Sequence, residues 1–382
     1  MLMLRGAAWL GAATWFGLVV ARGRFWDTRG TALRAPGAAR RLPDVYAIVP
    51  ARNEADVLPR TLGALRAQRY PGRLSILLVD DRSDDGTGVV AAASGADVLT
   101  GEPRADGWTG KVWALEQGVR AVRARGKTPA FWWFTDADVQ HGPDVLAALV
   151  ATAEDEDRDI VSLMVQLHCR TPAERLLIPA FVFFFMKLYP FRWVADARRG
   201  TAAAAGGCLL LRAEALARIG GVERIKDALI DDVAFASAVK SEGGALRLEL
   251  TDDSHSIRPY ESFGGIWSMV ARTAYTQLRY SPALLAGTVL GMTVLYIVPP
   301  AATIAGLAAR RPSIAAPGAF AWTLMALAYA PMLRRYRTSR WLAPLLPLAA
   351  LLYTGMTIDS ARRHVRGAGG SWKGRTFSPG AR

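Results

Sequence analysis

Hydrophobic and polar positions divide the chain into distinct regions. Apolar residues crowd into 7–21, 176–191 and most of 281–358, whereas the stretches between them mix apolar and charged positions. Long apolar runs are typical of membrane segments, and short apolar runs bounded by turn residues are typical of buried strands. The pattern therefore predicts a water-facing α/β domain together with membrane segments towards both ends of the chain.

The central region alternates between strand-like and helix-like patterns. Its uniformly apolar runs at 45–49, 74–79 and 131–134 predict buried strands, as expected of parallel strands covered on both faces. The other predicted elements are helices at 56–69, 88–93 and 111–123, strands at 96–99 and 159–166, and a glycine-rich turn leading into a strand over 203–211. Such alternation implies βαβ units, so we expect an α/β fold with parallel strands.

The first apolar segment predicts an uncleaved membrane anchor at residues 1–21. Only Arg5 precedes or interrupts its apolar core at 7–21, and most of the charge follows it, which places the following residues in the cytoplasm. The core has 15 residues, short of the roughly 20 that span a bilayer, so a helix lying on the membrane surface is an alternative. Residues 22–43, rich in Arg, Gly, Ala and Pro, are predicted to form a basic linker.

The C-terminal region predicts membrane helices over 281–358 and a basic tail over 359–382. The three apolar stretches are 281–308, 314–333 and 341–358. They hold no charged residue in their interiors, which argues against a water-lined channel. Three passes from a cytoplasmic domain would put the tail outside, although its basic residues favour the cytoplasm. Either the first stretch, broken at Pro299-Pro300, enters and returns, or one segment lies flat.

Residues 176–191 are apolar nearly throughout but are interrupted by Lys187 and two prolines. Sixteen residues are too few for an ordinary span, which needs roughly 20. A buried core helix and an interfacial segment both explain the pattern, and the aromatic residues with Lys187 favour the membrane interface. Residues 256–280 are assigned to a further interfacial segment.

Composition and charge narrow the possible partners. The 382 residues are 51% hydrophobic, and 47 basic against 33 acidic residues give a net charge of +14. Because the basic residues flank the apolar spans, they fit the positive-inside pattern of a membrane protein. No nucleic-acid-binding signature is present, so we predict a membrane partner and no nucleic acid. With only Cys169 and Cys208, a disulfide framework is excluded and a reducing compartment is allowed.

Carboxylates gather where the predicted strands end. Asp136 and Asp138 follow the strand at 131–134, and Asp80 and Asp81 follow the strand at 74–79. In an open α/β sheet, ligands bind outside the carboxyl ends of the strands. Two carboxylates one residue apart can hold a hard divalent cation while substrate phosphates complete its shell. An ordinary polar turn or a solvated loop explains the same residues without a ligand.

These motifs resemble the family 2 glycosyltransferases of the GT-A fold. The matching segments are Ile48-Val-Pro50-Ala-Arg-Asn53-Glu54, Leu78-Val-Asp80-Asp81-Arg-Ser-x-Asp-Gly86-Thr87 and Asp136-Ala-Asp138. The resemblance implies a catalytic domain at 44–255 with a mixed, mainly parallel sheet. It also implies that a nucleotide-sugar donor is bound through its nucleoside by the first strand end (Pro50, Asn53, Glu54) and by Asp80 and Asp81. Asp136 and Asp138 would hold Mg²⁺ or Mn²⁺ on its diphosphate.

Gly107-Trp-Thr-Gly110-Lys111 adds a candidate phosphate site, although Gly-Lys at a helix start is common. Lys111 begins a predicted helix, whose N-terminus favours phosphate, and a lysine there acts as a point charge on the diphosphate. Gly-Trp-x-Gly-Lys followed by Ala-Leu resembles the lipid-modifying branch of the family, including ceramide glucosyltransferases. The whole chain resembles the hopene-associated glycosyltransferases, and Trp372-Lys373-Gly374-Arg375 resembles a tail motif of the same relatives.

The family resemblance also assigns the acceptor side. Ile230-Asp231-Asp232 matches the acid-Asp motif, with Asp231 in place of the usual Glu, so Asp232 is the predicted base for the acceptor hydroxyl and Asp231 its supporting carboxylate. In the family, the segment equivalent to Gly206, Gly207 and Cys208 lines the acceptor pocket.

Two further signals are weaker. Gln277-Leu-Arg279-Tyr280 resembles the Gln/Arg-x-x-Arg-Trp motif of processive relatives, but it is one residue short and has Tyr for Trp. Arg279 is still expected to reach the donor diphosphate. The four histidines lack metal-ligand spacing, so His141 and His255 are interpreted as structural.

The sequence thus predicts a membrane-bound, metal-dependent inverting glycosyltransferase of the hexosyltransferase type. It would move a sugar from a nucleotide donor to a hydroxyl of a membrane lipid, hopanoid-related according to the resemblance. We expect a multi-pass protein of a bacterial-type inner membrane with the catalytic domain facing the cytoplasm. The alternatives are a polyprenyl-phosphate glycosyltransferase, a small processive polysaccharide synthase, and a degenerate transferase serving as a membrane scaffold.

Overall fold

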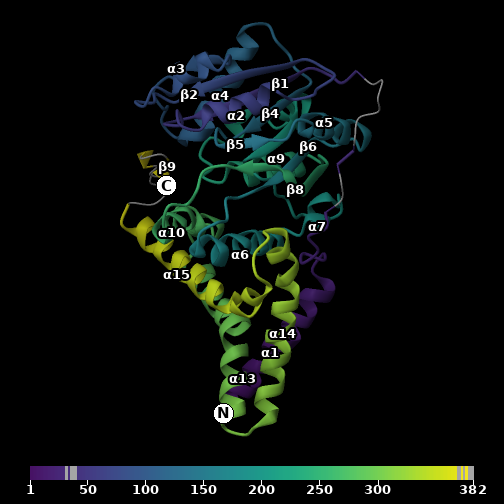
Figure 1. The fold of residues 1–382 in the computed structure, drawn as a ribbon, viewed down its shortest axis with the longest axis vertical. Coiled ribbons are helices and arrows are strands. Elements are labelled where there is room, and N and C mark those ends of the chain that lie inside the picture. The colour runs from purple at the N-terminus through teal and green to yellow at the C-terminus, as the bar shows by residue number, and fades with distance from the viewer. Residues whose placement is uncertain (31–32, 35–40, 368–370, 373–374, 377–382) are drawn as a thin grey trace. The chain divides into compact units, whose positions relative to one another are not determined.

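The computed structural model describes residues 1–30, 33–34, 41–367, 371–372 and 375–376. They belong to two compact units, which are drawn in Figure 1. The membrane unit comprises Met1–Thr28, Cys169–Arg192 and Tyr260–Gly370, and the sheet unit comprises Arg29–His168, Trp193–Pro259 and Ser371–Arg382. Arg40 of the predicted linker and Lys373 of the predicted tail motif lie outside the described residues.

An eight-stranded sheet, in the order β3-β2-β1-β4-β7-β6-β8-β5, forms the centre of the sheet unit. The strands are β1 (Val45–Ala51), β2 (Leu74–Asp80), β3 (Asp97–Thr100), β4 (Phe131–Thr135), β5 (Val139–His141), β6 (Ile160–Gln166), β7 (Cys208–Arg212) and β8 (Leu246–Ser256). Four neighbouring pairs are parallel and three, β4–β7, β6–β7 and β5–β8, are antiparallel. The predicted α/β fold with a mixed, mainly parallel sheet is confirmed. The sequence interpretation missed β5 and β8.

Helices connect these strands. They are α2 (Leu58–Arg66), α3 (Thr87–Ala93), α4 (Gly110–Ala124), α5 (Val145–Asp155), α8 (Ala213–Arg218), the 3₁₀ turn η1 (Val222–Ile225) and α9 (Asp231–Ser241). Two short strands near the end of the chain, β9 (Ser371–Trp372) and β10 (Arg375–Thr376), form a separate antiparallel pair. α4 lies close against β1, because a Cβ added at Gly118 would stand 2.7 Å from Cγ2 of Ile48. Glycine at this position therefore allows the helix to approach the strand.

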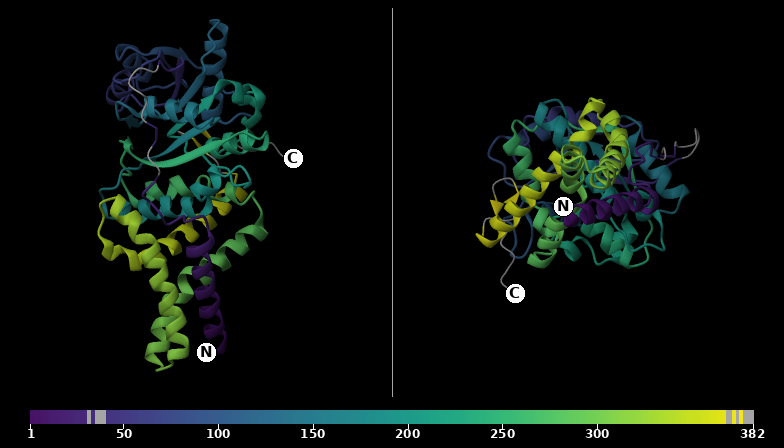
Figure 2. Two further views of the ribbon diagram at one scale, coloured as in Figure 1. Left: turned by 90° about the vertical axis from the view of Figure 1, so that its right-hand side faces the viewer. Right: turned by 90° about the horizontal axis from the view of Figure 1, so that it is seen from below.

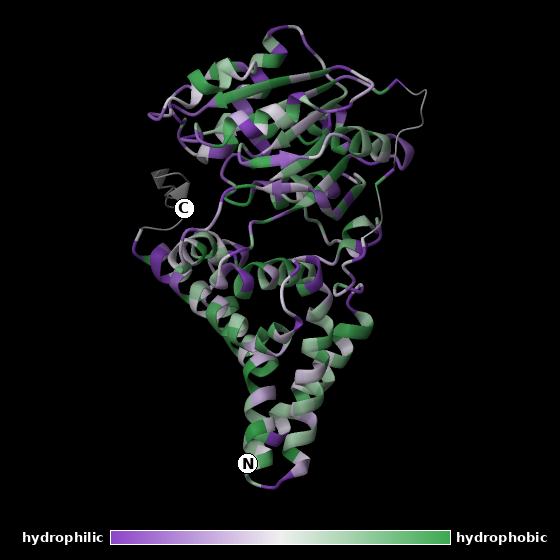
Figure 3. Ribbon diagram, viewed as in Figure 1, coloured by the Kyte–Doolittle hydropathy of each residue, from purple (hydrophilic) through white to green (hydrophobic). Residues whose placement is uncertain are grey.

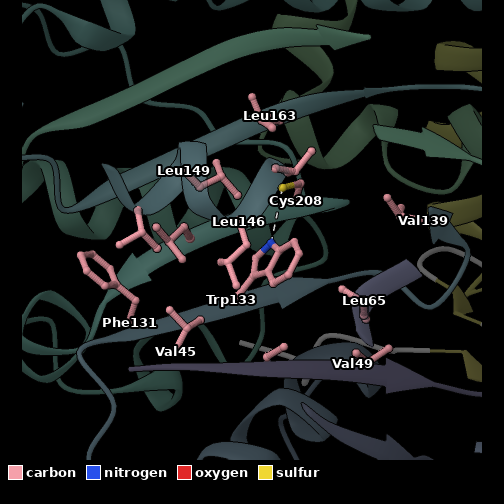
Figure 4. Close-up of a cluster of buried hydrophobic side chains, with 14 of the residues drawn as sticks. Val45, Val49, Leu65, Phe131, Trp133, Val139, Leu146, Leu149, Leu163 and Cys208 are labelled. Atoms are coloured by element: carbon pink, nitrogen blue, oxygen red, sulfur yellow. Dashed lines mark hydrogen bonds between the residues drawn. The ribbon is translucent and has the colours of Figure 1, made fainter. Parts of the chain in front are cut away.

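The main core of the sheet unit is built from strands β1, β4, β6 and β7 with helices α2 and α5. Figure 4 shows Phe131 and Trp133 of β4 among Leu146 and Leu149 of α5. The indole N–H of Trp133 donates to Sγ of Cys208 at 3.5 Å, so the polar atom of this buried aromatic residue has a partner. The uniformly apolar strands are explained by burial on both faces of the sheet.

The membrane unit is helical. Its elements are α1 (Leu2–Ala21), α6 (Pro172–Leu188), α10 (Phe263–Ala271), α11 (Ala274–Gln277), α12 (Pro282–Met292), the π-helix η2 (Thr293–Ile297), α13 (Val298–Ala308), α14 (Pro312–Arg335), η3 (Arg340–Leu345) and α15 (Leu346–Val365), and α7 (Phe191–Ala195) follows α6 at the boundary between the units. Figure 2 shows α1, α13 and α14 side by side, and the three helices contact one another. Apolar residues dominate these helices in Figure 3.

Five helical stretches of the described residues are long and apolar enough to cross a membrane. They are Leu2–Ala21, Pro172–Ala195, Pro282–Ala308, Pro312–Arg335 and Arg340–Val365. Helices of this length match the hydrocarbon thickness of a bilayer. The protein is therefore expected to be membrane-associated, as predicted.

The inference that the apolar segment at 176–191 is too short to span is wrong. The helical stretch begins at Pro172 and has 24 residues up to Ala195. Thr171 caps it, since its hydroxyl accepts from the N–H of Glu174 at 3.2 Å and the Glu174 carboxylate accepts from the N–H of Thr171 at 2.9 Å. This capping box satisfies two backbone donors, so the helix starts before the apolar run does.

The re-entrant alternative for 281–308 is also wrong. The backbone stays helical from Pro282 to Ala308, with a π-helical turn over Thr293–Ile297. Pro299 and Pro300 directly follow this π-helical turn, and the helix continues past both of them to Ala308. The prolines therefore do not reverse the chain.

His141 gives the sheet unit a pH-dependent stability. Its side chain is buried and bonded to the hydroxyls of Thr135 (2.8 Å) and Ser254 (2.9 Å), and burial lowers the pKa of His141 to about 3. As the pH falls below the ordinary value of 6.5, the unfolded chain binds a proton that the folded chain cannot. Stability should then fall by about 1.4 kcal/mol per pH unit.

Thermal unfolding of the detergent-solubilised chain between pH 7.5 and 5.5 would measure this effect. We expect His141→Gln to reduce the slope, whereas His255→Gln, an exposed position on the neighbouring strand β8, should leave it unchanged. Equal slopes in wild type and His141→Gln would show that His141 is not kept neutral by the fold.

Candidate active site

Three parallel strands bring their carboxyl ends to one edge of the sheet. β1 pairs with β2 so that Ala51 lies opposite Asp80, and with β4 so that Ile48 lies opposite Phe134. The segments that follow these strands contain the predicted nucleoside-binding and metal-binding residues. The parallel register therefore brings the motifs of the sequence to a common edge, where ligands of open α/β sheets bind.

The loops after β1 and β2 are bonded to each other. Pro50 is a buried residue of β1. The N–H of Asn53 donates to the Ser83 hydroxyl at 3.0 Å, and Oδ1 of Asn53 accepts from the N–H of Asp84 at 3.1 Å. Asn53 has a φ of 53°, a left-handed conformation that Asn tolerates better than most residues. Asn53 therefore fixes the paired loop geometry.

Several acidic residues of these loops have hydrogen-bond or ion-pair partners within the protein. Oδ1 of Asp80 accepts from the N–H of Ser83 at 3.0 Å. Asp81 is buried, and its Oδ2 lies 3.7 Å from the Arg52 guanidinium. Glu54, only 7% exposed, forms an ion pair with Arg258. Internal bonds thus account for part of the acidic character of this edge.

Lys111 connects two other segments of the candidate site. From the first turn of α4, its Nζ lies 2.8 Å from Oδ1 of Asp136 and 3.1 Å from Oδ2 of Asp231. Although burial opposes the charged form, these carboxylates raise the pKa of Lys111 above its ordinary value. Lys111 is therefore a fixed positive charge between the end of β4 and the start of α9.

Asp232 is held by backbone donors at the N-terminus of α9. Its Oδ2 accepts from the N–H of Gly206 at 2.7 Å and its Oδ1 from the N–H of Val233 at 2.8 Å. Burial and the neighbouring Asp231 raise the pKa of Asp232 to about 7. A base with a pKa near the working pH is well suited to proton transfer.

Gly206 brings the base and Lys111 close together. A Cβ built on Gly206 would stand 3.0 Å from Nζ of Lys111 and 3.4 Å from Oδ2 of Asp232. A side chain there would press on the lysine head group, so the absence of one allows the close packing. Gly207 also lies against other groups, since its Cβ would stand 2.9 Å from Cγ2 of Val165.

Asp136 and Asp138 offer oxygen ligands of the kind that Mg²⁺ and Mn²⁺ prefer. Oδ2 of Asp138 accepts from the Ser256 hydroxyl at 2.7 Å. Burial raises the pKa of Asp136 despite Lys111, and the charge of Asp138 adds to this shift, so a divalent cation would relieve the crowding of negative charge. Among the described residues no three His, Cys, Asp or Glu side chains form a complete metal site. The pair fits a cation whose remaining ligands are donor phosphates and water.

Two further residues, Cys208 and Arg279, were also predicted to belong to the site. The Cys208 side chain is fully buried in the core, and burial raises the pKa of its thiol to about 12, so it presents neither a pocket surface nor a nucleophile. Arg279 belongs to the membrane unit, where it follows α11 with a φ of 51°. Its approach to a donor diphosphate stays a prediction.

Sequence reasoning missed Arg52, Ser256 and Arg258, which bond to the acidic residues of this edge. Arg52 lies inside the first motif and could have been singled out as a cation among carboxylates. Ser256 and Arg258 carry no such signal, because their partners are 118 and 204 residues away along the chain.

Comparisons with known proteins show which sequences and structures this chain is similar to. Residues 46–220 match the model of Glycosyl transferase family 2. Over 108 residues the chain is 34% identical to an uncharacterized glycosyltransferase of Mycobacterium tuberculosis, recorded in two strains. That match covers 28% of this chain and 39% of the relative, so the chain matches well under half of the relative's length.

A solved structure shows the same architecture. The mannosyltransferase of Pyrobaculum calidifontis, determined in complex with GDP-Man and Mn²⁺, has a TM-score of 0.55 and 19% identity, with 93% of this chain and 99% of that chain covered. At this identity the likeness shows the fold alone. Residues 46–220 therefore match a glycosyltransferase family 2 domain, and the fold is GT-A-like.

Replacing Lys111 tests the charge arrangement of the site. In Lys111→Met, Asp136 and Asp231 lose their cation, and we expect a loss of about 2 kcal/mol of stability at pH 8. Without Lys111, which lowers the pKa of Asp136, the Asp136 carboxylate would bind a proton more tightly in the folded chain than in the unfolded chain. The loss of stability should therefore shrink as the pH falls towards 5. Thermal unfolding across this pH range measures the effect.

Lys111→Arg keeps the positive charge and is the matched control, which should lose less stability at pH 8. A loss in Lys111→Met that is independent of pH would contradict the electrostatic role and indicate altered packing alone.

Proposed function

We propose that this protein is a membrane-bound inverting glycosyltransferase that moves a sugar from a nucleotide-sugar donor to a hydroxyl of a membrane lipid. The observation that carries the proposal is the bridge of Lys111 between Asp136 and Asp231, next to the partly buried Asp232. This arrangement provides a positive charge for a leaving diphosphate and a base for an acceptor at one sheet edge. The family 2 match supports the reaction class.

In the proposed reaction, Asp232 takes the proton of the acceptor hydroxyl. The acceptor oxygen forms a bond to the anomeric carbon as the bond from that carbon to the diphosphate oxygen breaks. Lys111 stabilises the negative charge of the departing diphosphate. A Mg²⁺ or Mn²⁺ ion held by Asp136 and Asp138 would supply further charge neutralisation there. Because one displacement inverts the carbon, an α-linked donor would give a β-linked product.

The lipid acceptor is inferred from the membrane unit. Five candidate spanning helices among the described residues occur in the same chain as the match to the family 2 domain. A membrane lipid would share the bilayer with these helices, so it is the acceptor that we propose. A hopanoid or similar isoprenoid is proposed from the resemblance to the hopene-associated branch.

Transfer of radiolabel tests this function. Detergent-solubilised protein would be incubated with labelled sugar nucleotides, hopanoid-containing lipid extract and Mn²⁺. We expect label in the lipid phase, lost with EDTA and reduced roughly 10²–10⁴-fold in Asp232→Asn, as expected for loss of a general base. Asp155→Asn, an exposed position on α5, is the control and should keep full activity.

Other outcomes identify the alternatives. Label in insoluble polymer would favour a processive synthase, and label in a lipid that releases the sugar in mild acid would favour a polyprenyl phosphate acceptor. No transfer from any donor, with no UDP or GDP binding by calorimetry, would overturn the enzyme and favour a scaffold.

The pH dependence of transfer tests the roles of the two aspartates. Because Asp232 acts as a base when deprotonated and its pKa is raised to about 7, the rate should rise with pH through about 7. Asp231→Asn removes the neighbouring negative charge, which lowers the pKa of Asp232 and should move this rising limb to lower pH. An unchanged limb in Asp231→Asn would mean that another group controls it.

A further inference from the structure

Three consecutive residues at the end of β8, Ser256 to Arg258, hold two separate loops of the candidate site. The Ser256 hydroxyl donates to Oδ2 of Asp138 at 2.7 Å, and the N–H of Ile257 donates to the carbonyl of Asp138 at 2.9 Å. Both the side chain and the backbone of Asp138 are therefore fixed from one segment. We call Ser256–Arg258 the β8 clamp.

The third residue of the β8 clamp holds the loop after β1. The Arg258 guanidinium pairs with Glu54 and lies 3.2 Å from Oδ1 of Asp56. Glu54 is buried, and its N–H donates to the Thr87 hydroxyl at 2.8 Å. The carboxylate of Glu54 is paired with Arg258 inside the protein, so Glu54 holds the conformation of the loop after β1. Asn53 is the preceding residue of the same loop.

The irregular end of β8 explains how one segment reaches both loops. β8 pairs parallel with β6 along Leu246–Leu250, and the register shifts before His255 pairs with Gln166. Beyond this irregularity, Ser256 lies opposite Val139 of β5 in an antiparallel pair. β5 immediately follows Asp138, so the pairing sets Ser256 beside the carboxylate.

We propose that Ser256 and Arg258 are positioning residues of the donor site, an inference that rests on the proposed function. By binding Oδ2 of Asp138, Ser256 fixes the carboxylate rotamer and leaves Oδ1 for the divalent cation. Arg258 holds the loop of Pro50 to Glu54 in the shape that receives the nucleoside. Hydrogen-bonded partners of this kind orient metal ligands, and their loss typically lowers metal affinity about 10–100-fold.

A purely structural role is the alternative, and Mn²⁺ binding separates the two. The full-length protein in detergent would be titrated with Mn²⁺ in the presence of UDP or GDP, and free Mn²⁺ would be followed by electron paramagnetic resonance. We expect Ser256→Ala to bind Mn²⁺ about 10–100-fold more weakly with an almost unchanged melting temperature. Ser256→Thr keeps the hydroxyl and should restore the affinity.

Ser254 provides the matched control. It lies two residues earlier on β8 and bonds to the buried His141 at 2.9 Å. Ser254→Ala should lower the melting temperature while Mn²⁺ affinity stays near that of wild type. The opposite pattern for the two serines therefore distinguishes positioning of a ligand from support of the fold.

Arg258 is tested through nucleotide affinity. Arg258→Met should weaken UDP or GDP binding, measured by calorimetry, because the loop of Pro50 to Glu54 loses the ion pair that holds it. We expect a loss of about 10-fold or more, which corresponds to about 1.4 kcal/mol. Arg258→Lys keeps the charge and should recover part of the affinity. A Met variant with a lowered melting temperature but unchanged nucleotide affinity would assign Arg258 to the fold alone.

The outcomes separate the two levels of the proposal. Wild type that binds Mn²⁺ and nucleotide, with equal affinities in Ser256→Ala and Arg258→Met, would overturn the β8 clamp and leave the proposed glycosyltransferase standing. Wild type that binds neither Mn²⁺ nor any nucleotide would overturn both.

Discussion

Crowding of carboxylates at one edge of a sheet is the constraint on which the candidate site depends. Asp136, Asp231 and Asp232 come from two segments, and the charge of Asp231 raises the pKa of both Asp136 and Asp232. Lys111 offsets this repulsion because its ammonium lies within 3.1 Å of two of the three carboxylates. Asp232 is instead held by backbone N–H groups. Lys111 therefore offsets the negative charge of Asp136 and Asp231.

The same constraint divides the carboxylates by role. Asp136 shares Lys111, Asp138 is held by Ser256 and Glu54 is held by Arg258. Asp232 is held by backbone donors, but burial and Asp231 outweigh this stabilisation and raise the pKa of Asp232 to about 7. The surroundings of each side chain thus make Asp232 the candidate base, Asp136 and Asp138 the candidate metal ligands, and Glu54 a structural group.

The membrane unit depends on a different constraint, the need to satisfy every backbone donor within a helix in an apolar medium. Helix α6 continues through Pro179, and α14 contains Pro317 and Pro331. These prolines therefore lie within the helices and do not end them. Hydropathy therefore identified the apolar segments, whereas interpreting prolines as breaks led to a segment at 176–191 that was too short and to a re-entrant alternative for 281–308.

The sequence by itself determined six of the eight strands of the sheet, the strand–helix alternation and the strand-end motifs. These are local patterns, because a uniformly apolar run reports burial on both faces and a motif is read from adjacent residues. Parallel strands also end at a common edge, so the approach of Asp80 and Asp136 to one edge followed from the pattern. The two missed strands, β5 (Val139–His141) and β8 (Leu246–Ser256), include a very short strand and one with polar residues along its second half.

Only the tertiary structure decided the partners of the acidic residues. The bonds from Ser256 to Asp138 and from Arg258 to Glu54 cross 118 and 204 residues of chain, and they depend on the register shift in β8 and on its pairing with β5. Register and sheet order arise from the summed packing of many distant residues, so no local pattern encodes them. The identities of the charged groups were therefore readable from the sequence, whereas the arrangement that sets their roles required the fold.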